Sequence, residues 1–409
     1  MTLGAHPVFV VLAAAVAAPL LAEIRAARRV PVVVLEVLLG ILIGPHVLRL
    51  VEFDAFLSVM LIIGTTAVLF MAGMEIDFER IRGRPLSLAL RGWAVSVGLA
   101  FLAVVLLHVI PGVHAPMMVA IALTTTALGT LLPILRDGGQ FDTPFGRLLL
   151  ATGMTGEVGP IVAVSLAVSQ RYSSWQEFGF LLIFLALVVL ASAVGMGARP
   201  PKLLALLSRT MHASTQLPVR LALFVLATLV VVAVEFGFEG ILGAFAAGMV
   251  VGLATRGEEG KAFRGRIDAV CFGWFTPFFF VGTGIKFDLG GLTRDVTTML
   301  LIPALLMLFL VVRGTPVLLY RHDIPKSEQL PFALYASVAS LGLVVVLTEI
   351  GVRAKVMNPA IAQALMGAAL LSSLVFPTLA RVLSSRTPRL TPCADARSDG
   401  PACGYPGTT

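Results

Sequence analysis

The stretch Leu39-Gly-Ile-Leu-Ile-Gly44 resembles Ala247-Gly-Met-Val-Val-Gly252, which lies 208 residues further along the chain. A second pair, Gly73-Met-Glu-Ile-Asp77 and Gly284-Ile-Lys-Phe-Asp288, is separated by 211 residues. Apolar sequence with small residues repeats easily by chance, but two matches at nearly the same spacing favour a true internal repeat. Each stretch lies inside an apolar run or directly after one, so the repeated unit is built from apolar segments.

The composition of the whole chain is that of a membrane protein. Hydrophobic residues make up 58% of the 409 residues and charged residues only 13%, about half of the ~25% that is usual in soluble domains. The mean hydropathy is +0.96. These values exclude a cytosolic globular enzyme and a long disordered protein.

Apolar runs that are broken by charged or Pro/Gly-rich segments predict about thirteen transmembrane helices. Their approximate bounds are 7–24, 31–47, 58–75, 87–110, 115–135, 146–168, 177–198, 217–236, 239–255, 268–286, 296–320, 329–350 and 360–382. The first run lacks a basic segment before it, so we expect a retained helix rather than a cleaved signal peptide.

The similar stretches fall in helices 2 and 9 and after helices 3 and 10, seven helices apart. An odd separation means that the two copies cross the membrane in opposite directions, which is typical of inverted-topology repeats. We therefore predict an all-α integral membrane protein with a transmembrane domain over 1–383. Repeat one covers about 7–168, a linker helix about 177–198 and repeat two about 217–382. Residues 384–409 form a short cytoplasmic tail that we expect to be disordered.

Basic residues are distributed unevenly between the two sets of predicted loops. One set holds 23 of the 30 Lys and Arg residues and the other set holds six, while Arg313 falls within a predicted helix. Because cytoplasmic loops carry the excess of basic residues, the N-terminus is predicted outside and the C-terminus in the cytoplasm of a multi-pass plasma-membrane protein. The net charge of +7 thus indicates contact with membrane lipids, and no nucleic-acid partner is expected.

Two ionisable residues lie inside predicted helices, where a charge is costly and invites a functional hypothesis. Glu157 lies in Ala151-Thr-Gly-Met-Thr-Gly-Glu-Val-Gly-Pro160, about eleven residues into its helix. A carboxylate there must be protonated, paired or ion-bound, so it can exchange a proton for Na⁺ or K⁺. Arg313 is a candidate charge partner for Glu157 because its charge is permanent. The alternatives are a permanent structural pair, a neutral buried acid, and an arginine that extends to the membrane interface.

Helices 5 and 12, at corresponding positions of the two repeats, carry polar and small residues that predict broken helices. The first contains Thr124 to Thr130, followed by Pro133, and the second contains Ser337, Ser340 and Gly342. Such pairs of interrupted helices mark the ion site of many transporters, because unwound carbonyls and hydroxyls suit a hard monovalent cation. We expect ion-binding oxygens from Thr125, Thr126 and Ser340, and helix breaks or close packing at Gly129, Gly156 and Gly342. The alternative is that the hydroxyls bond back to their own helix.

Other kinds of chemistry lack a sequence signal. No nucleotide-binding or zinc-protease motif occurs in a usable context, and the three cysteines have no metal-site spacing. We therefore expect a transporter rather than an enzyme, with no cofactor and no nucleotide partner. Glu36, about six residues into helix 2, is interpreted as a packing residue, with a gate as the alternative.

Four stretches in order along the chain resemble one family. They are Val30-Pro-Val-Val-Val-Leu-Glu-Val-Leu-Leu-Gly-Ile-Leu-Ile-Gly-Pro45, Leu69-Phe-Met-Ala-Gly-Met-Glu-Ile-Asp77, Leu242-Gly-Ala-Phe-Ala-Ala-Gly248 and Phe278-Phe-Phe-Val-Gly-Thr-Gly284. Together they are similar to the motifs of Kef/Nap-type monovalent cation:proton antiporters, in the sodium/hydrogen exchanger superfamily. The resemblance covers about residues 30–380, and we expect no nucleotide-binding domain of the kind that Kef relatives carry.

The resemblance implies the NhaA-like fold: thirteen helices in a dimerisation domain and a mobile core domain, two crossed discontinuous helices, and a homodimer. Family members usually carry Asp-Asp, Asn-Asp or Gln-Asp in the sixth helix, where this chain has Gly156-Glu157. They also often carry Lys or Arg in the eleventh helix, a position that Arg313 matches. With one carboxylate in place of a pair, we expect electroneutral exchange of one cation for one proton.

The predicted function is therefore secondary active exchange of Na⁺ or K⁺ for protons by alternating access, with Glu157 as the shared site and pH homeostasis as the setting. Alternatives are a K⁺ efflux channel, a Na⁺-coupled organic-solute symporter and a membrane sensor that transports nothing. The sequence leaves open which alkali cation is carried, in which direction and at which pH.

Overall fold

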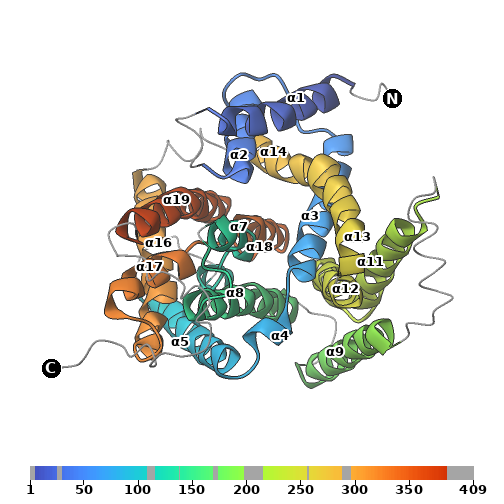
Figure 1. The fold of residues 1–409 in the computed structure, drawn as a ribbon. Coiled ribbons are helices and arrows are strands. Elements are labelled where there is room, and N and C mark those ends of the chain that lie inside the picture. Colours follow the sequence, from blue (N-terminus) through green and yellow to red (C-terminus); the bar gives the residue numbers. More distant parts are fainter. Residues whose placement is uncertain are drawn as a thin grey trace.

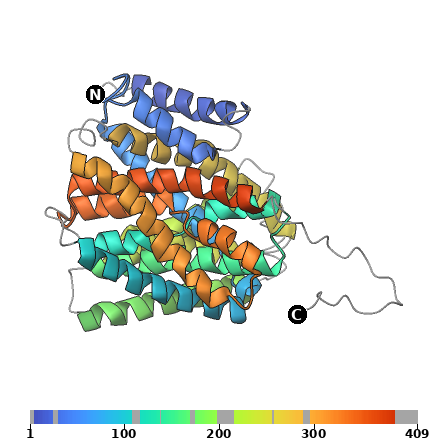
Figure 2. The ribbon, with the colours of Figure 1, turned by 90° about the vertical axis from the view of Figure 1, so that its left-hand side faces the viewer.

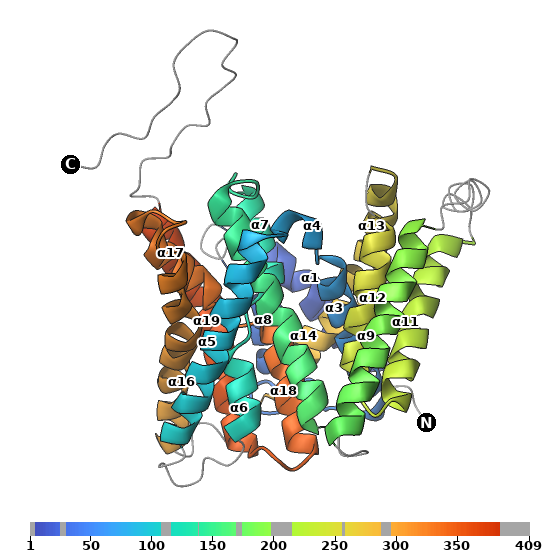
Figure 3. The same cartoon turned by 90° about the horizontal axis from the view of Figure 1, so that it is seen from below.

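The computed structural model describes residues 5–24, 30–107, 116–137, 139–168, 174–197, 215–255, 258–287 and 296–384. Within these ranges the regular structure is entirely helical. Figure 1 shows the helices gathered in two groups, and Figures 2 and 3 show most of the long helices running along one common direction. Of the tail predicted over 384–409, Ser384 ends the last helix and residues 385–409 lie outside the described residues.

The first group consists of helices from the beginning and the middle of the chain. Its members are α1 (Ala5–Ala22), α2 (Val32–Ile43), α3 (Ala55–Met74), α9 (Ser174–Gly197), α11 (Leu217–Glu235), α12 (Gly240–Ala254), α13 (Glu258–Val270), the π-turn η1 (Cys271–Phe275) and α14 (Thr276–Lys286). The last three form one continuous apolar span over Ala262–Lys286.

The second group contains the two interrupted helices. Its members are α5 (Arg84–Leu107), α6 (Pro116–Leu123), α7 (Leu128–Asp137), α8 (Pro144–Val168), α16 (Val296–Gly314), the 3₁₀ turn η2 (Thr315–Tyr320), α17 (Lys326–Ala336), α18 (Leu341–Arg353) and α19 (Pro359–Ser384). The short helix α4 (Phe78–Ile81) leads from α3 into this group.

Every one of the thirteen segments predicted from the sequence contains helix. Among the described residues, seven helices are long and apolar enough to cross a bilayer, and α17 with α18 forms an eighth span that is bent by 40°. Large apolar side chains such as Phe224, Val105 and Val189 are more than 60% exposed, as suits contact with lipid. The chain is a multi-pass, all-α membrane protein, and the number of crossings stays a prediction.

Two glycine crossings relate the helices of the first group. A Cβ atom on Gly40 of α2 would lie 2.9 Å from Cα of Gly284 in α14, and one on Gly248 of α12 would lie 2.9 Å from Cα of Gly73 in α3. These four glycines belong to the repeated stretches of sequence. By the repeat, α2 corresponds to α12 and α3 corresponds to α14. The α2–α14 crossing therefore corresponds to the α12–α3 crossing, as inverted repeats require. The backbones approach this closely only because no side chain separates them.

Candidate functional site

The two interrupted helices cross in the second group and bind each other through their unwound segments. The segment between α6 and α7 covers residues 124–127, and the segment between α17 and α18 covers residues 337–340. Ala127 N–H donates to Val338 O at 2.8 Å, and Thr126 N–H donates to Gly156 O of α8 at 3.0 Å. Since buried protein supplies these partners, irregular backbone is tolerated at this depth. The predicted helix breaks are thus confirmed.

Thr126 joins four elements of this crossing. Its hydroxyl donates to Ala336 O, the last residue of α17, at 2.7 Å and accepts from Nε of Arg313 at 2.8 Å. Its side chain is completely buried. Thr126 therefore holds the broken helices together, and its oxygen is already engaged.

Glu157 lies beside the crossing, on α8. Its residue exposure is only 6%, and Ser340 donates its hydroxyl to Oε1 at 3.1 Å. The backbone N–H of Leu128, at the start of α7, also faces this carboxylate. The second oxygen, Oε2, is buried and has no hydrogen-bond partner among the described residues. A carboxylate with an unused oxygen can take up either a proton or a cation.

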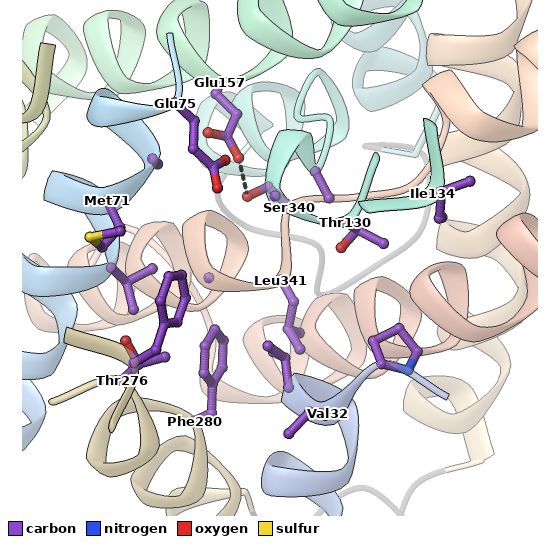
Figure 4. Close-up of a pocket in the computed structure, with 18 of the residues that line it drawn as sticks. Val32, Met71, Glu75, Thr130, Ile134, Glu157, Thr276, Phe280, Ser340 and Leu341 are labelled. Atoms are coloured by element: carbon purple, nitrogen blue, oxygen red, sulfur yellow. Dashed lines mark hydrogen bonds between the residues drawn. The ribbon is translucent and has the colours of Figure 1, made fainter. Parts of the chain in front are cut away.

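A cavity of about 490 Å³ reaches Glu157 between the two helix groups. The first group contributes residues of α2, α3 and α14 to the wall, and the second group contributes residues of α7, α8, α18 and α19. Figure 4 shows the carboxylates of Glu157 and Glu75 pointing toward the same region of the cavity, beside Ser340. The wall extends to Val30 and Arg381, at one end of the bundle.

Arg313 of α16 is 2% exposed and does not extend to an interface. Its Nε donates to Thr126, Nη1 to Ser96 Oγ at 3.2 Å, and Nη2 to Thr152 O at 2.9 Å. No ion pair joins these described atoms to Glu157. A buried guanidinium that is hydrogen-bonded at all three nitrogens is a fixed positive charge beside the crossing. Its role as charge partner of Glu157 stays a prediction, which would act through space rather than by direct contact.

Gly156 has a reason to lack a side chain. A Cβ atom there would lie 2.7 Å from Nη2 of Arg313 and 2.7 Å from Cβ of Thr126. The position that carries a polar residue in the resembled family therefore faces an arginine and a threonine here. Gly129 and Gly342 are each the second residue of the helix after a break, α7 and α18, and both line the cavity. Their role in breaking or packing the helices stays a prediction.

Thr125 is placed differently from the other predicted oxygen donors. Its hydroxyl donates to Ala122 O, one turn earlier, at 2.8 Å, and it does not line the cavity. The alternative interpretation, a hydroxyl bonded back to its own helix, describes this residue. Of the three predicted oxygens, only that of Ser340 contacts Glu157.

Sequence reasoning missed several residues of this region. Ser96 and Thr152 bind Arg313, Ser372 accepts from Ala339 N–H at 3.0 Å, and Glu75 lines the cavity. In the sequence Glu75 stands out only as part of a repeated stretch and of a family-like motif, because a carboxylate at the end of an apolar run resembles an interface residue. Single Ser and Thr residues in apolar helices carry no signal that distinguishes them from packing residues.

Comparison with known proteins supports the interpretation of this architecture. The structure titled as the sodium proton antiporter MjNhaP1 from Methanocaldococcus jannaschii at pH 8 superimposes with a TM-score of 0.55 and 17% sequence identity. The match covers 93% of this chain and 94% of that chain. At this identity the likeness shows a shared fold.

Two bacterial relatives are similar in sequence. The Bacillus subtilis (strain 168) protein named "Putative Na(+)/H(+) antiporter YjbQ" is 26% identical over 92% of this chain, which spans only 62% of that relative. The Bacillus cereus protein named "Na(+)/H(+)-K(+) antiporter GerN" is 24% identical over 65% of this chain and 68% of its own length. The profile of the family "Sodium/hydrogen exchanger, transmembrane" matches residues 11–384. The chain belongs to this family of monovalent cation:proton antiporters.

Proposed function

We propose that the protein exchanges a monovalent alkali cation for protons and that Glu157 binds the two in turn. The observation that carries the proposal is the buried carboxylate of Glu157, which faces a cavity between the two helix groups and has one oxygen without a hydrogen-bond partner among the described residues. Ser340 and the unwound segments beside it offer further oxygens. The names of the relatives, Na⁺/H⁺ and Na⁺/H⁺-K⁺ antiporters, support the same pair of substrates.

Competition at one carboxylate couples the two fluxes. A proton and a cation each neutralise Glu157, so the occupied site has the same net charge in both cases, and Arg313 adds a constant charge. The exchange is therefore electroneutral, one cation for one proton. An empty, charged Glu157 is disfavoured at this depth, which limits uncoupled return of the unloaded protein.

The direction in which the cavity opens follows from the basic residues. The cavity wall ends near Arg381 and Val30, and Val30 directly follows the basic stretch that contains Arg28 and Arg29. By the excess of basic residues this end faces the cytoplasm. We therefore propose that this conformation is open to the cytoplasm, with the N-terminus outside. We further propose that the chain forms a homodimer in the plasma membrane, without cofactor or nucleotide.

Proteoliposomes loaded with a pH-sensitive dye test the function. Adding Na⁺ or K⁺ to acid-loaded vesicles should move protons in the wild type, and Glu157→Gln should abolish this flux. Glu79→Gln, an exposed carboxylate on α4, is the matched control and should retain it. Full cation-coupled flux in Glu157→Gln would refute the assignment. Flux that ignores the proton gradient would favour a channel, and Na⁺ uptake stimulated by an organic solute would favour a symporter.

A further inference from the structure

Glu75 provides a second carboxylate in the cavity, and it comes from the opposite helix group. It follows the last residue of α3, and its backbone N–H donates to Met71 O at 3.2 Å. Its Oε2 lies 3.7 Å from the position that a Cβ atom of Gly129 would occupy, so it reaches the first turn of α7. Figure 4 shows it entering from α3 while Glu157 enters from α8. Two carboxylates therefore face one cavity from two different groups.

A second, independent observation indicates that the cavity binds a ligand. Glu157 is more than nine-tenths buried, lines this cavity, and has an oxygen without a hydrogen-bond partner among the described residues. A cation on this oxygen would lie in the space that Glu75 also faces. Negative charges along a cleft with low-dielectric walls raise the local concentration of cations.

Glu75 has an oppositely charged counterpart in the other repeat. The spacing of 211 residues relates it to Lys286, which ends α14 as Glu75 ends α3. Lys286 does not line the cavity. Its Nζ binds Glu349 of α18 at 3.0 Å and lies 4.4 Å from the centroid of the Phe53 ring. The first group thus carries a carboxylate in the cavity at one end of the bundle and, at the other end, an ammonium that is paired with Glu349.

We propose that Glu75 is a cation-binding residue of the conformation seen here and that it attracts the alkali cation to Glu157 from this side of the membrane only. The inference rests on the proposed function. Glu75 belongs to the first helix group, whereas Glu157 and Gly129 belong to the second. When the groups move relative to each other, Glu75 moves with the first group and the ion moves with Glu157 in the second. Glu75 then no longer faces the ion. The apparent cation affinity is therefore higher from the cavity side than from the opposite side.

Everted and right-side-out membrane vesicles test this difference in cation affinity between the two membrane faces. In Glu75→Gln the KM for Na⁺ should rise about fivefold on one membrane face and stay unchanged on the other, with the maximal rate kept. Glu75→Asp, which preserves the charge, should restore most of the affinity. Glu79→Gln, the next carboxylate after Glu75 that lies on α4, is the control and should match the wild type on both faces.

The outcomes separate the two proposals. If the wild type shows no cation-dependent proton flux, the proposed function fails. If the wild type transports and Glu75→Gln has unchanged or equally changed KM values on both faces, the role of Glu75 is refuted. Should Glu75→Gln not reach the membrane, labelling of wild-type Glu75 by a carbodiimide, followed by mass spectrometry, decides instead. Na⁺ should slow this labelling at least severalfold, and labelling that ignores Na⁺ would overturn the inference.

Discussion

The guanidinium of Arg313 fills the space beside Gly156: a Cβ atom on this glycine would lie 2.7 Å from Nη2. The same Nη2 donates to Thr152 O, and Nε donates to Thr126, so the guanidinium is held from two sides. Arg313 and the residue before Glu157 therefore share one volume. A side chain at position 156 and the present hydrogen bonds of Arg313 exclude each other.

Gly156→Asn, which introduces a residue typical of the resembled family at this position, should therefore impair the protein. The added atoms displace Arg313 or Thr126, and overpacking of this kind costs about 1–3 kcal/mol. We expect a lower Tm in detergent and a loss of cation-coupled flux, measured by fluorescence-detected unfolding and in proteoliposomes.

Gly153→Ala is the control for this substitution in the same helix. Its Cβ would meet the flexible ends of Leu128 and Leu131, at 3.1 and 3.4 Å, so only a small loss of stability is expected. A Gly156→Asn protein with wild-type Tm and flux would show that Arg313 can leave its position without consequence.

The two glycine crossings should respond alike to substitution. In Gly40→Ala and Gly248→Ala the new methyl group collides with the backbone of the crossing helix, which cannot move aside as a flexible side chain can. Each should lower stability by about 1–3 kcal/mol, and the two losses should be similar because the crossings are related by the repeat.

Gly98→Ala in α5 is the opposite case. No atom lies within 4 Å of its added Cβ, and alanine favours a helix over glycine by about 1 kcal/mol. This variant should match or exceed the wild-type Tm, as measured in the same unfolding assay. Equal losses in all three variants would contradict the packing argument.

Part of the site follows from sequence because its signals are local. Glu157 is an acidic residue deep in an apolar run, and runs of Thr, Ser and Gly mark the helix breaks. The partners of Arg313 do not follow, because Ser96 and Thr152 come from helices far apart in the chain. Glu75 does not follow for a similar reason: only the fold brings the side chain at the end of α3 close to Gly129 of α7 and into the cavity.

An ion pair at one end of the second group makes stability depend on pH. Arg84 donates from Nε and Nη2 to both carboxylate oxygens of Asp323, at 2.6 and 3.0 Å. The hydrogen bond from Arg84 holds the pKa of Asp323 below its usual value of 3.8. The stabilisation is therefore present above pH ~4 and is lost as the pH falls through the lowered pKa of the folded state.

Asp323→Asn should accordingly lower the Tm slightly at pH 7, since the Arg84 side chain is 68% exposed and ion pairs with an exposed partner contribute little. The difference from the wild type should shrink as the pH falls below ~4 and should vanish below the lowered pKa of the folded state, where Asp323 is neutral in both states. High salt should shrink it as well. A difference in Tm that is constant from pH 7 to pH 3 would show that the pair does not act through charge.

The ion pair of Lys286 and Glu349 links the two helix groups at the ends of α14 and α18 that lie away from the cavity. Their Nζ and Oε1 atoms are 3.0 Å apart, and both side chains are more than a third exposed. In the proposed inward-open conformation this pair holds the groups together on the closed side. A pair with this exposure contributes about 0.5–1 kcal/mol, which corresponds to a two- to fivefold shift between conformations.

Lys286→Gln should therefore reduce the population with the cavity open. Thr130 lines the cavity, so a cysteine in its place reports how often the cavity is open. A membrane-impermeant thiol reagent added from the cavity side should react with this cysteine two- to fivefold more slowly in the Lys286→Gln background. The charge-reversed pair Lys286→Glu with Glu349→Lys should restore the rate, because the attraction is regained across the same interface. If the rate is unaltered in Lys286→Gln and in the reversed pair alike, the contact packs the two groups together without favouring either conformation.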